Sequence, residues 1–95
     1  MKHCIISKFN DSVSDKAALI ENVKALFAAE PKPEGVRGYE FIVNCIDRPN
    51  RYDLMIAIDM PADALPNWDA STLHKRWKAE FGDYLAAKAI FDYEP

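Results

Sequence analysis

The sequence lacks the features that mark several large classes of protein. No apolar stretch approaches the roughly 18 residues that cross a bilayer, and Lys8 closes the apolar N-terminal segment too early for a signal peptide. Lysine and arginine number 12 against 15 acidic residues, a formal charge of −3 with no basic run. Because phosphate binding needs clustered cations, nucleic acid is not expected as a partner. We therefore expect a cytoplasmic protein that binds neither nucleic acid nor membranes.

Cysteine and the common catalytic motifs are also scarce. Cys4 and Cys45 are the only cysteines, and they form neither a C-x-x-C pair nor the Cys/His spacing of a zinc site. The sequence has no P-loop, no dinucleotide fingerprint and no Gly-x-Ser-x-Gly elbow. These absences disfavour nucleotide enzymes and serine hydrolases, and we expect no metal and no cofactor.

What is present is the pattern of one small α+β domain over residues 1–95, with 49% hydrophobic residues. Strands are predicted from alternating or continuous apolar residues over 2–9, 38–46, 51–60 and 89–93. Between the third and fourth of these strands, a short helical piece starts at Pro61 and is interrupted by Pro66.

Two main helices complete the pattern. Helical periodicity covers residues 15–29, with Ser14 as the N-cap, and returns from Ser71 or Thr72 to about Leu85. The resulting order, βαββαβ, predicts a ferredoxin-like fold in which two helices cover one face of a four-stranded antiparallel sheet. In this topology the first and third strands are central, and these two are the most apolar on both sides.

The predicted sheet separates the strands that carry Cys4 and Cys45 by one strand. Two inter-strand steps span roughly 9–10 Å, beyond the roughly 7 Å Cα separation that a disulfide tolerates. We therefore expect two buried thiols that act as small apolar residues.

One face of the predicted sheet has no helix to cover it. Met55 and Ala57, with Cys4 and Ile6 on the neighbouring strand, make this face apolar. Covering about 400 Å² of it would contribute on the order of 10 kcal/mol, although association costs offset much of this gain. We predict a homodimer that packs sheet on sheet into a dimeric α/β barrel. The alternative is a monomer whose open face tolerates water.

Several short motifs resemble the stress-responsive A/B-barrel (Dabb) domain family. Residues 2–9 (KHCIISKF) match its "KHxxxxKF" opening, and residues 52–54 (YDL) match its third-strand start. Residues 71–74 (STLH) match its "HPxH" helix start, with Ser71 in place of the first histidine, and residues 90–93 (IFDY) match its closing strand. The resemblance covers essentially the whole chain and implies a dimeric α+β barrel.

The sequence is similar in particular to the olivetolic acid cyclase-like proteins of that family, which close a polyketide by an aldol-type condensation without a cofactor. This resemblance implies that His3 and His74 are the catalytic residues. The pocket tyrosine of those proteins falls on Trp68, whose indole offers a bulkier ring and an N–H in place of a hydroxyl.

The residues themselves leave two interpretations of these histidines. His74 shares a helical stripe with Trp77 and Phe81 near a helix start, which favours a neutral imidazole base. An aldol closure needs such a base and a proton donor, which two imidazoles supply. The alternative is a core histidine at 74 and a surface histidine at 3.

The aromatic residues have two interpretations as well, because they either line an apolar ligand cavity or pack the core. The candidates for ligand binding are Trp68, Trp77, Phe81, Tyr39 and Phe41.

Three functional hypotheses follow. The first is a Dabb-type homodimer that binds a small apolar molecule in a cavity near His74. The second is a cofactor-independent polyketide cyclase or lyase that uses His74 and His3. The third is a non-catalytic stress-response protein.

Overall fold

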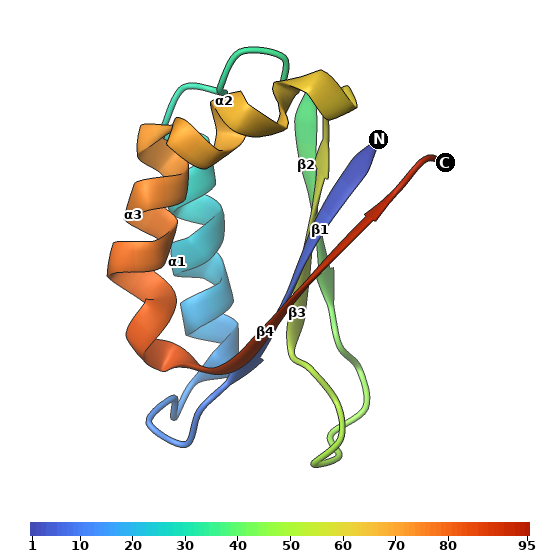
Figure 1. Ribbon diagram of the computed structural model, residues 1–95. Helices are drawn as coiled ribbons and strands as arrows, with labels where there is room; N and C mark the ends of the chain where they lie inside the picture. Colours follow the sequence, from blue (N-terminus) through green and yellow to red (C-terminus); the bar gives the residue numbers. More distant parts are fainter.

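The computed structural model describes every residue, 1–95, and confirms the predicted α+β class and ferredoxin-like arrangement (Figure 1). The antiparallel sheet has the order β2-β3-β1-β4, so the first and third strands are central, as predicted. Its strands are β1 (Lys2–Phe9), β2 (Gly38–Val43), β3 (Leu54–Asp59) and β4 (Leu85–Tyr93). One face carries the helices α1 (Lys16–Ala29), α2 (Leu65–Ala70) and α3 (Thr72–Phe81).

The start of α1 corrects the predicted cap. Asp15, not Ser14, is the N-cap, and its Oδ1 accepts a hydrogen bond from the backbone N–H of Ala18 at 3.0 Å. Asp15 has the extended backbone that a cap requires and reaches a free N–H of the first turn.

The strands on either side of residues 44–53 are shorter than predicted. β2 ends at Val43 and β3 begins at Leu54. Asp53, just before β3, still bonds both neighbouring strands through its backbone: its N–H donates to Ser7 and its carbonyl oxygen accepts from Asn44. Its carboxylate accepts hydrogen bonds from the backbone N–H of Phe9 at 2.7 Å and from Nζ of Lys16 at 2.9 Å. Asp53 thereby ties the end of β1 to the start of α1.

The segment between β3 and β4 differs most from the prediction. Pro66 does not interrupt a helix but lies in the first turn of α2, where a missing N–H costs no intrahelical bond. Ser71 then caps α3, because its Oγ accepts from the backbone N–H of His74 at 3.1 Å. α3 ends at Phe81 rather than at about residue 85, since Gly82–Tyr84 form a 3₁₀ turn. β4 then begins at Leu85, earlier than the predicted residue 89.

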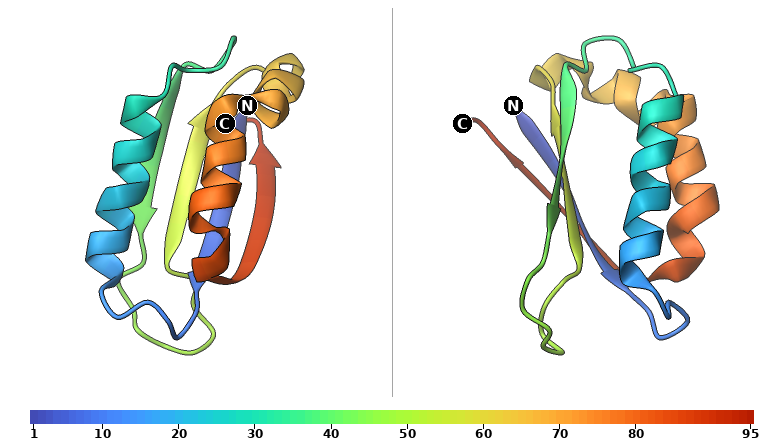
Figure 2. Two further views of the ribbon diagram at one scale, coloured as in Figure 1. Left: turned by 90° about the vertical axis from the view of Figure 1, so that its left-hand side faces the viewer. Right: turned by 180° about the vertical axis from the view of Figure 1, so that it is seen from behind.

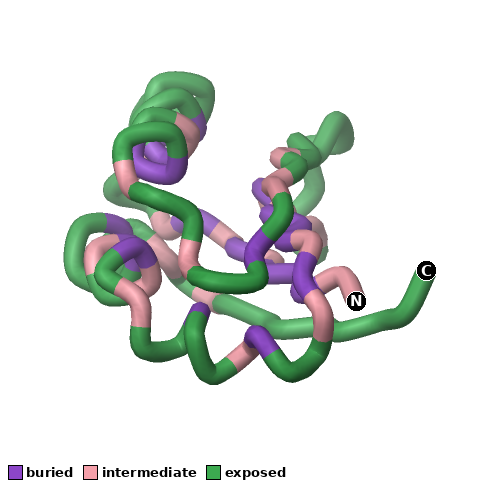
Figure 3. The backbone as a smooth tube through the Cα atoms, turned by 90° about the horizontal axis from the view of Figure 1, so that it is seen from above, coloured by how far each residue is buried: buried purple, intermediate pink, exposed green.

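The core fills the space between the helices and the sheet, as the buried positions in Figure 3 show. Phe27 of α1 is at its centre: its ring centroid lies 5.0 Å from that of Tyr39, 5.5 Å from Phe41, 6.1 Å from Trp68 and 6.2 Å from Trp77. Tyr39 and Phe41 meet it edge on, a favourable geometry for aromatic pairs.

β4 extends beyond the cover of the helices. In Figure 2 (left) α3 lies in front of β1, and β4 runs to one side of it. Ile90 of β4 pairs with the buried Ile5 and therefore faces the helix side, yet it is 49% exposed. The helix side of β4 is thus open to solvent next to α3.

The opposite face of the sheet carries no helix, as expected (Figure 2, right). The register places apolar side chains across all four strands of this face, and Phe91 is 62% exposed. We call these residues the open sheet face: Cys4, Ile6, Ile42, Met55, Ala57, Ala89, Phe91 and Tyr93.

Both cysteines are free thiols. Cys4 is buried, as predicted. Cys45 is exposed, contrary to the prediction, because β2 ends before it. Membrane crossing is not supported by any helix, since none has both the length and the apolar character for it.

Candidate functional site

β1 brings His3 into the layer between the sheet and the helices. The residue is 5% exposed, so it is not the surface histidine of the alternative interpretation. Its Nδ1 lies 2.5 Å from Oδ1 of Asp92, the residue directly opposite on β4. This contact joins positions 89 residues apart in the sequence.

α3 brings His74 to the same end of the layer. Its Nδ1 lies 3.0 Å from the backbone carbonyl oxygen of Asp69, just before the Ser71 cap. Arg76, on the same helix, pairs with Glu30 of α1 at 2.8 Å, so that side of α3 faces α1. On the side of α3 opposite to Arg76, Lys78 faces β4, and Lys78 follows His74 by one helical turn. His74 therefore lies on the β4 side of α3.

Both imidazoles are fixed through Nδ1 and free at Nε2. A carboxylate and a carbonyl oxygen only accept hydrogen bonds, so in each neutral ring Nδ1 carries the proton. Neither Nε2 has a hydrogen-bond partner, and neither is among the buried polar atoms that lack one, so solvent reaches both. In this tautomer Nε2 carries the lone pair that acts as a base.

We expect both histidines to hold the Nδ1–H tautomer once deprotonated, because His3 donates to Asp92 and His74 to the Asp69 carbonyl. Long-range ¹H–¹⁵N correlation spectra at high pH measure this directly. Asp92→Ala is the control, and it should release His3 to the Nε2–H form while leaving His74 unchanged. An Nε2–H ring at His3 in the unmodified protein would contradict the assignment.

Trp68 of α2 is adjacent to both rings. Its indole centroid lies 6.4 Å from that of His3 and 5.0 Å from that of His74, and the side chain is fully buried. The bulk expected at this position therefore fills the space beside the two imidazoles. None of the five main surface pockets is lined by Trp68, His3 or His74.

The other aromatic candidates do not gather in one cavity. Trp77 borders a hollow of about 280 Å³ between α3 and β4, whereas Phe81 lines a groove between α1 and α3. Tyr39 and Phe41, both on the edge strand β2, pack on Phe27 and line a separate hollow of about 330 Å³ against α1. Burial raises the pKa of Tyr39, whose buried hydroxyl has no hydrogen-bond partner. In this structure these four side chains belong to the packed core or its rim.

Asp92 is a candidate site residue that the sequence alone does not single out. It lies in the closing strand, where alternation places it on the same side as Ile90. The pairing of Asp92 with His3 follows only from the register between β1 and β4, which sets the two residues opposite each other.

Neither the Cys4 thiol nor a cluster of metal-ligating side chains offers a second reactive site. Burial raises the pKa of the Cys4 thiol, and the negative charge of Asp92 raises it further, so the thiol stays protonated at neutral pH. No group of three or more histidine, cysteine, aspartate or glutamate side chains is placed to hold a metal ion.

Comparison with known sequences gives one full-length relative. No protein-family model matches the chain. The uncharacterized protein SCO4036 of Streptomyces coelicolor is 33% identical over 97 residues, which cover 99% of this chain and 98% of that protein.

Comparison with solved structures confirms the fold. A dimeric protein of unknown function and ferredoxin-like fold from Bacteroides fragilis is similar, with a TM-score of 0.79, 19% identity and coverage of 99% of this chain and 94% of that chain. A Dabb family protein with a ferredoxin-like fold from Mesorhizobium loti gives 0.73 and 13%, with 99% and 94% covered. The hydroxynitrile lyase of Passiflora edulis gives 0.74 and 11%, with 97% and 89% covered. The resemblance to the Dabb family is thus confirmed at the level of the fold.

Proposed function

Because the chain belongs to one family with SCO4036 of Streptomyces coelicolor and has the fold of a Dabb protein, we propose that it is a Dabb-type homodimer that transfers protons on a small, largely apolar molecule. One observation carries this proposal: His3 is buried, its Nδ1 is held by Asp92, and its Nε2 is free. Residues 1–95 would form the single domain that does this work.

The open sheet face supports the homodimer. Its apolar side chains span all four strands, and Phe91 is largely exposed in the isolated chain. A second copy that packs the same face against it removes this surface from water and closes a barrel between the subunits. The dimeric Bacteroides fragilis protein of the same fold is in agreement with this arrangement.

The two imidazoles supply the chemistry. Nε2 of His3 accepts a proton from an O–H or an activated C–H of the ligand, and Asp92 orients the ring and stabilises the imidazolium that forms. Nε2 of His74 acts as a second acceptor or, once protonated, returns a proton to a developing oxyanion. Apolar surface for the ligand comes from Ile90 and Leu85 of β4.

Lyase chemistry is one form of this step. A base that removes the hydroxyl proton of a cyanohydrin forms the carbonyl while the C–C bond breaks, and cyanide leaves with the electron pair. The Passiflora edulis hydroxynitrile lyase shares the fold. A polyketide cyclisation instead needs more room next to His3 and His74, where Trp68 is packed.

The fully buried Trp68 favours a second candidate function, which is binding without catalysis in a stress-response protein. With the indole packed beside both rings, an apolar ligand would contact the outer part of the site alone.

The two unpaired thiols fit a reducing compartment, so we place the protein in the cytoplasm.

A base-catalysed probe separates these functions. The Kemp elimination of 5-nitrobenzisoxazole needs only a positioned base: the C–H proton goes to the base, the N–O bond breaks, and a coloured phenolate forms. We expect His3→Gln to lower kcat/KM by about 100-fold and Asp92→Asn by less, because general-base catalysis contributes on the order of 10²–10⁴. Lys75→Gln, on an exposed position of α3, is the control. Equal rates in all variants, or no catalysis by the unmodified protein, would overturn the proton-transfer proposal.

A further inference from the structure

The hollow between α3 and β4 has an unusual balance of charge. It measures about 280 Å³, and Trp77 and Leu85 give it apolar walls. Lys78 of α3 and Lys88 of β4 are its only charged lining residues, and no carboxylate lines it. In a chain of formal charge −3, this is a local concentration of positive charge.

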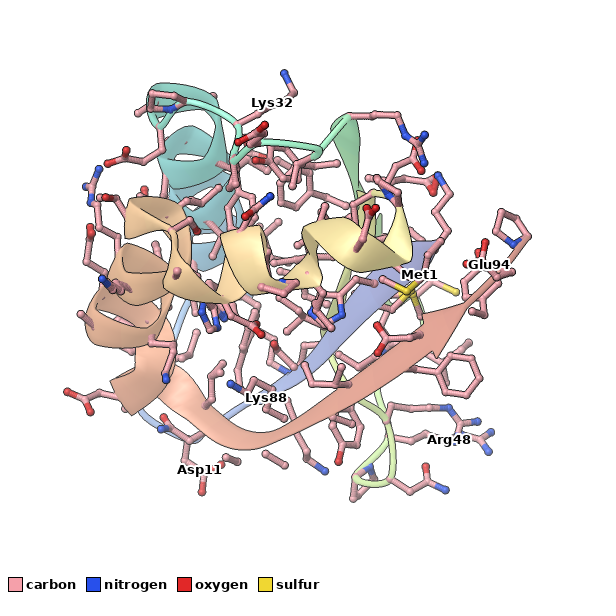
Figure 4. The ribbon with its side chains drawn as sticks, turned by 45° about the horizontal axis from the view of Figure 1, so that its top comes forward. Met1, Asp11, Lys32, Arg48, Lys88 and Glu94 are labelled. Atoms are coloured by element: carbon pink, nitrogen blue, oxygen red, sulfur yellow. The ribbon has the colours of Figure 1, made fainter.

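Neither lysine has a partner. Lys78 and Lys88 form no ion pair and no side-chain hydrogen bond, like most lysines of this chain, of which only Lys16 and Lys24 pair with carboxylates. Figure 4 shows Lys88 on the side of β4 that faces α3. Two unpaired cations that border one hollow repel each other, and a bound anion relieves that repulsion.

A buried polar group lies on the neighbouring strand β1, although it does not line the hollow itself. Ser7 of β1 is directly opposite Lys88 in the register, so both face the helix side of the sheet. Its Oγ is fully buried and has no hydrogen-bond partner, which is uncommon for a buried hydroxyl.

We propose that this hollow binds the carboxylate of an amphipathic acid whose apolar part lies along β4 toward His3. The direction of the apolar part rests on the proposed function, whereas the carboxylate site does not. Lys88 and Asp92 lie on the same side of β4 four residues apart, about 13 Å at the rise of a strand. Ile90 lies between them and offers exposed apolar surface to the chain of the ligand. The substrate class is therefore a medium-length acid with its reactive group far from its carboxylate.

The test uses octanoate, 1-octanol and inorganic phosphate as probes, each titrated into the ¹⁵N-labelled protein. Octanoate should shift the amide signals of Lys78, Leu85 and Lys88, and the double variant Lys78→Gln/Lys88→Gln should weaken its binding at least tenfold. Lys75→Gln, which removes one charge from the same helix, should leave octanoate binding unchanged. Octanol should bind more weakly and be indifferent to the double substitution.

Each other outcome overturns the proposal. Octanoate binding that the double variant does not weaken, or shifts confined to other surfaces, shows that the lysines do not form the site. Phosphate that binds at the lysines as tightly as octanoate assigns the hollow to a free inorganic anion instead. None of these readings depends on proton transfer, so loss of the Kemp activity in the histidine variants and failure of the carboxylate site are separate results.

Discussion

Replacing Trp68 with alanine is expected to lower the free energy of unfolding by about 3–5 kcal/mol, the range for removing a large aromatic side chain from a core. The indole is fully buried and packs against Phe27, His3 and His74. Because no part of it is exposed to solvent, we expect the full loss of unfolding free energy. Denaturant unfolding at one fixed protein concentration measures the change, since a dimer's stability depends on concentration. Trp68→Phe, which retains an aromatic ring, should cost less.

The same variant tests whether the indole takes the place of a ligand. Trp68→Ala leaves an apolar cavity beside both imidazoles, and such cavities bind small aromatic molecules. Added indole should therefore restore part of the lost stability in Trp68→Ala and have no such effect on Trp68→Phe. A loss below about 1 kcal/mol would show that the indole is not packed as described.

Phe91→Asp is expected to raise the dissociation constant of the proposed homodimer at least about 100-fold. In a two-fold symmetric interface each substitution occurs twice, and a buried aromatic anchor typically contributes 2 kcal/mol or more. Sedimentation velocity at micromolar concentration should give a dimer for the unmodified protein and a monomer for the variant.

Ile90→Asp is the matched control for this experiment. Ile90 is the neighbouring residue on β4 and is also well exposed, but it faces the helix side of the sheet rather than the open sheet face. The variant should remain dimeric. Dissociation of both variants alike, or a monomeric unmodified protein, would reject sheet-on-sheet pairing.

The sequence predicted the strand order because the order depends on a few strong signals. Alternation in β3 and the apolar residues on both sides of β1 identify the two central strands. Element boundaries were less predictable, since they depend on side chains that bond to distant backbone. Asp53, for example, lies just before β3 and its carboxylate accepts from the N–H of Phe9, 44 residues away.

The candidate site was predicted only in part for a similar reason. His3 and His74 are the only histidines, so the sequence points to them, but the carboxylate that meets His3 follows from the register between β1 and β4. Local periodicity carries no information on a register between strands so far apart in the sequence. Trp68 was singled out from the resemblance, and the structure alone shows how closely it packs beside both rings.

The 89-residue separation between His3 and Asp92 also bears on the order of folding. The local segments α1, α2 and α3 need only short loops to close, whereas β1 must meet β4 across nearly the whole chain, a step with a large entropy cost. We therefore expect the imidazole–carboxylate contact to be among the latest to form. A partly folded chain with its helices in place would already hold His74 near the start of α3, while His3 would still lack its contact with Asp92.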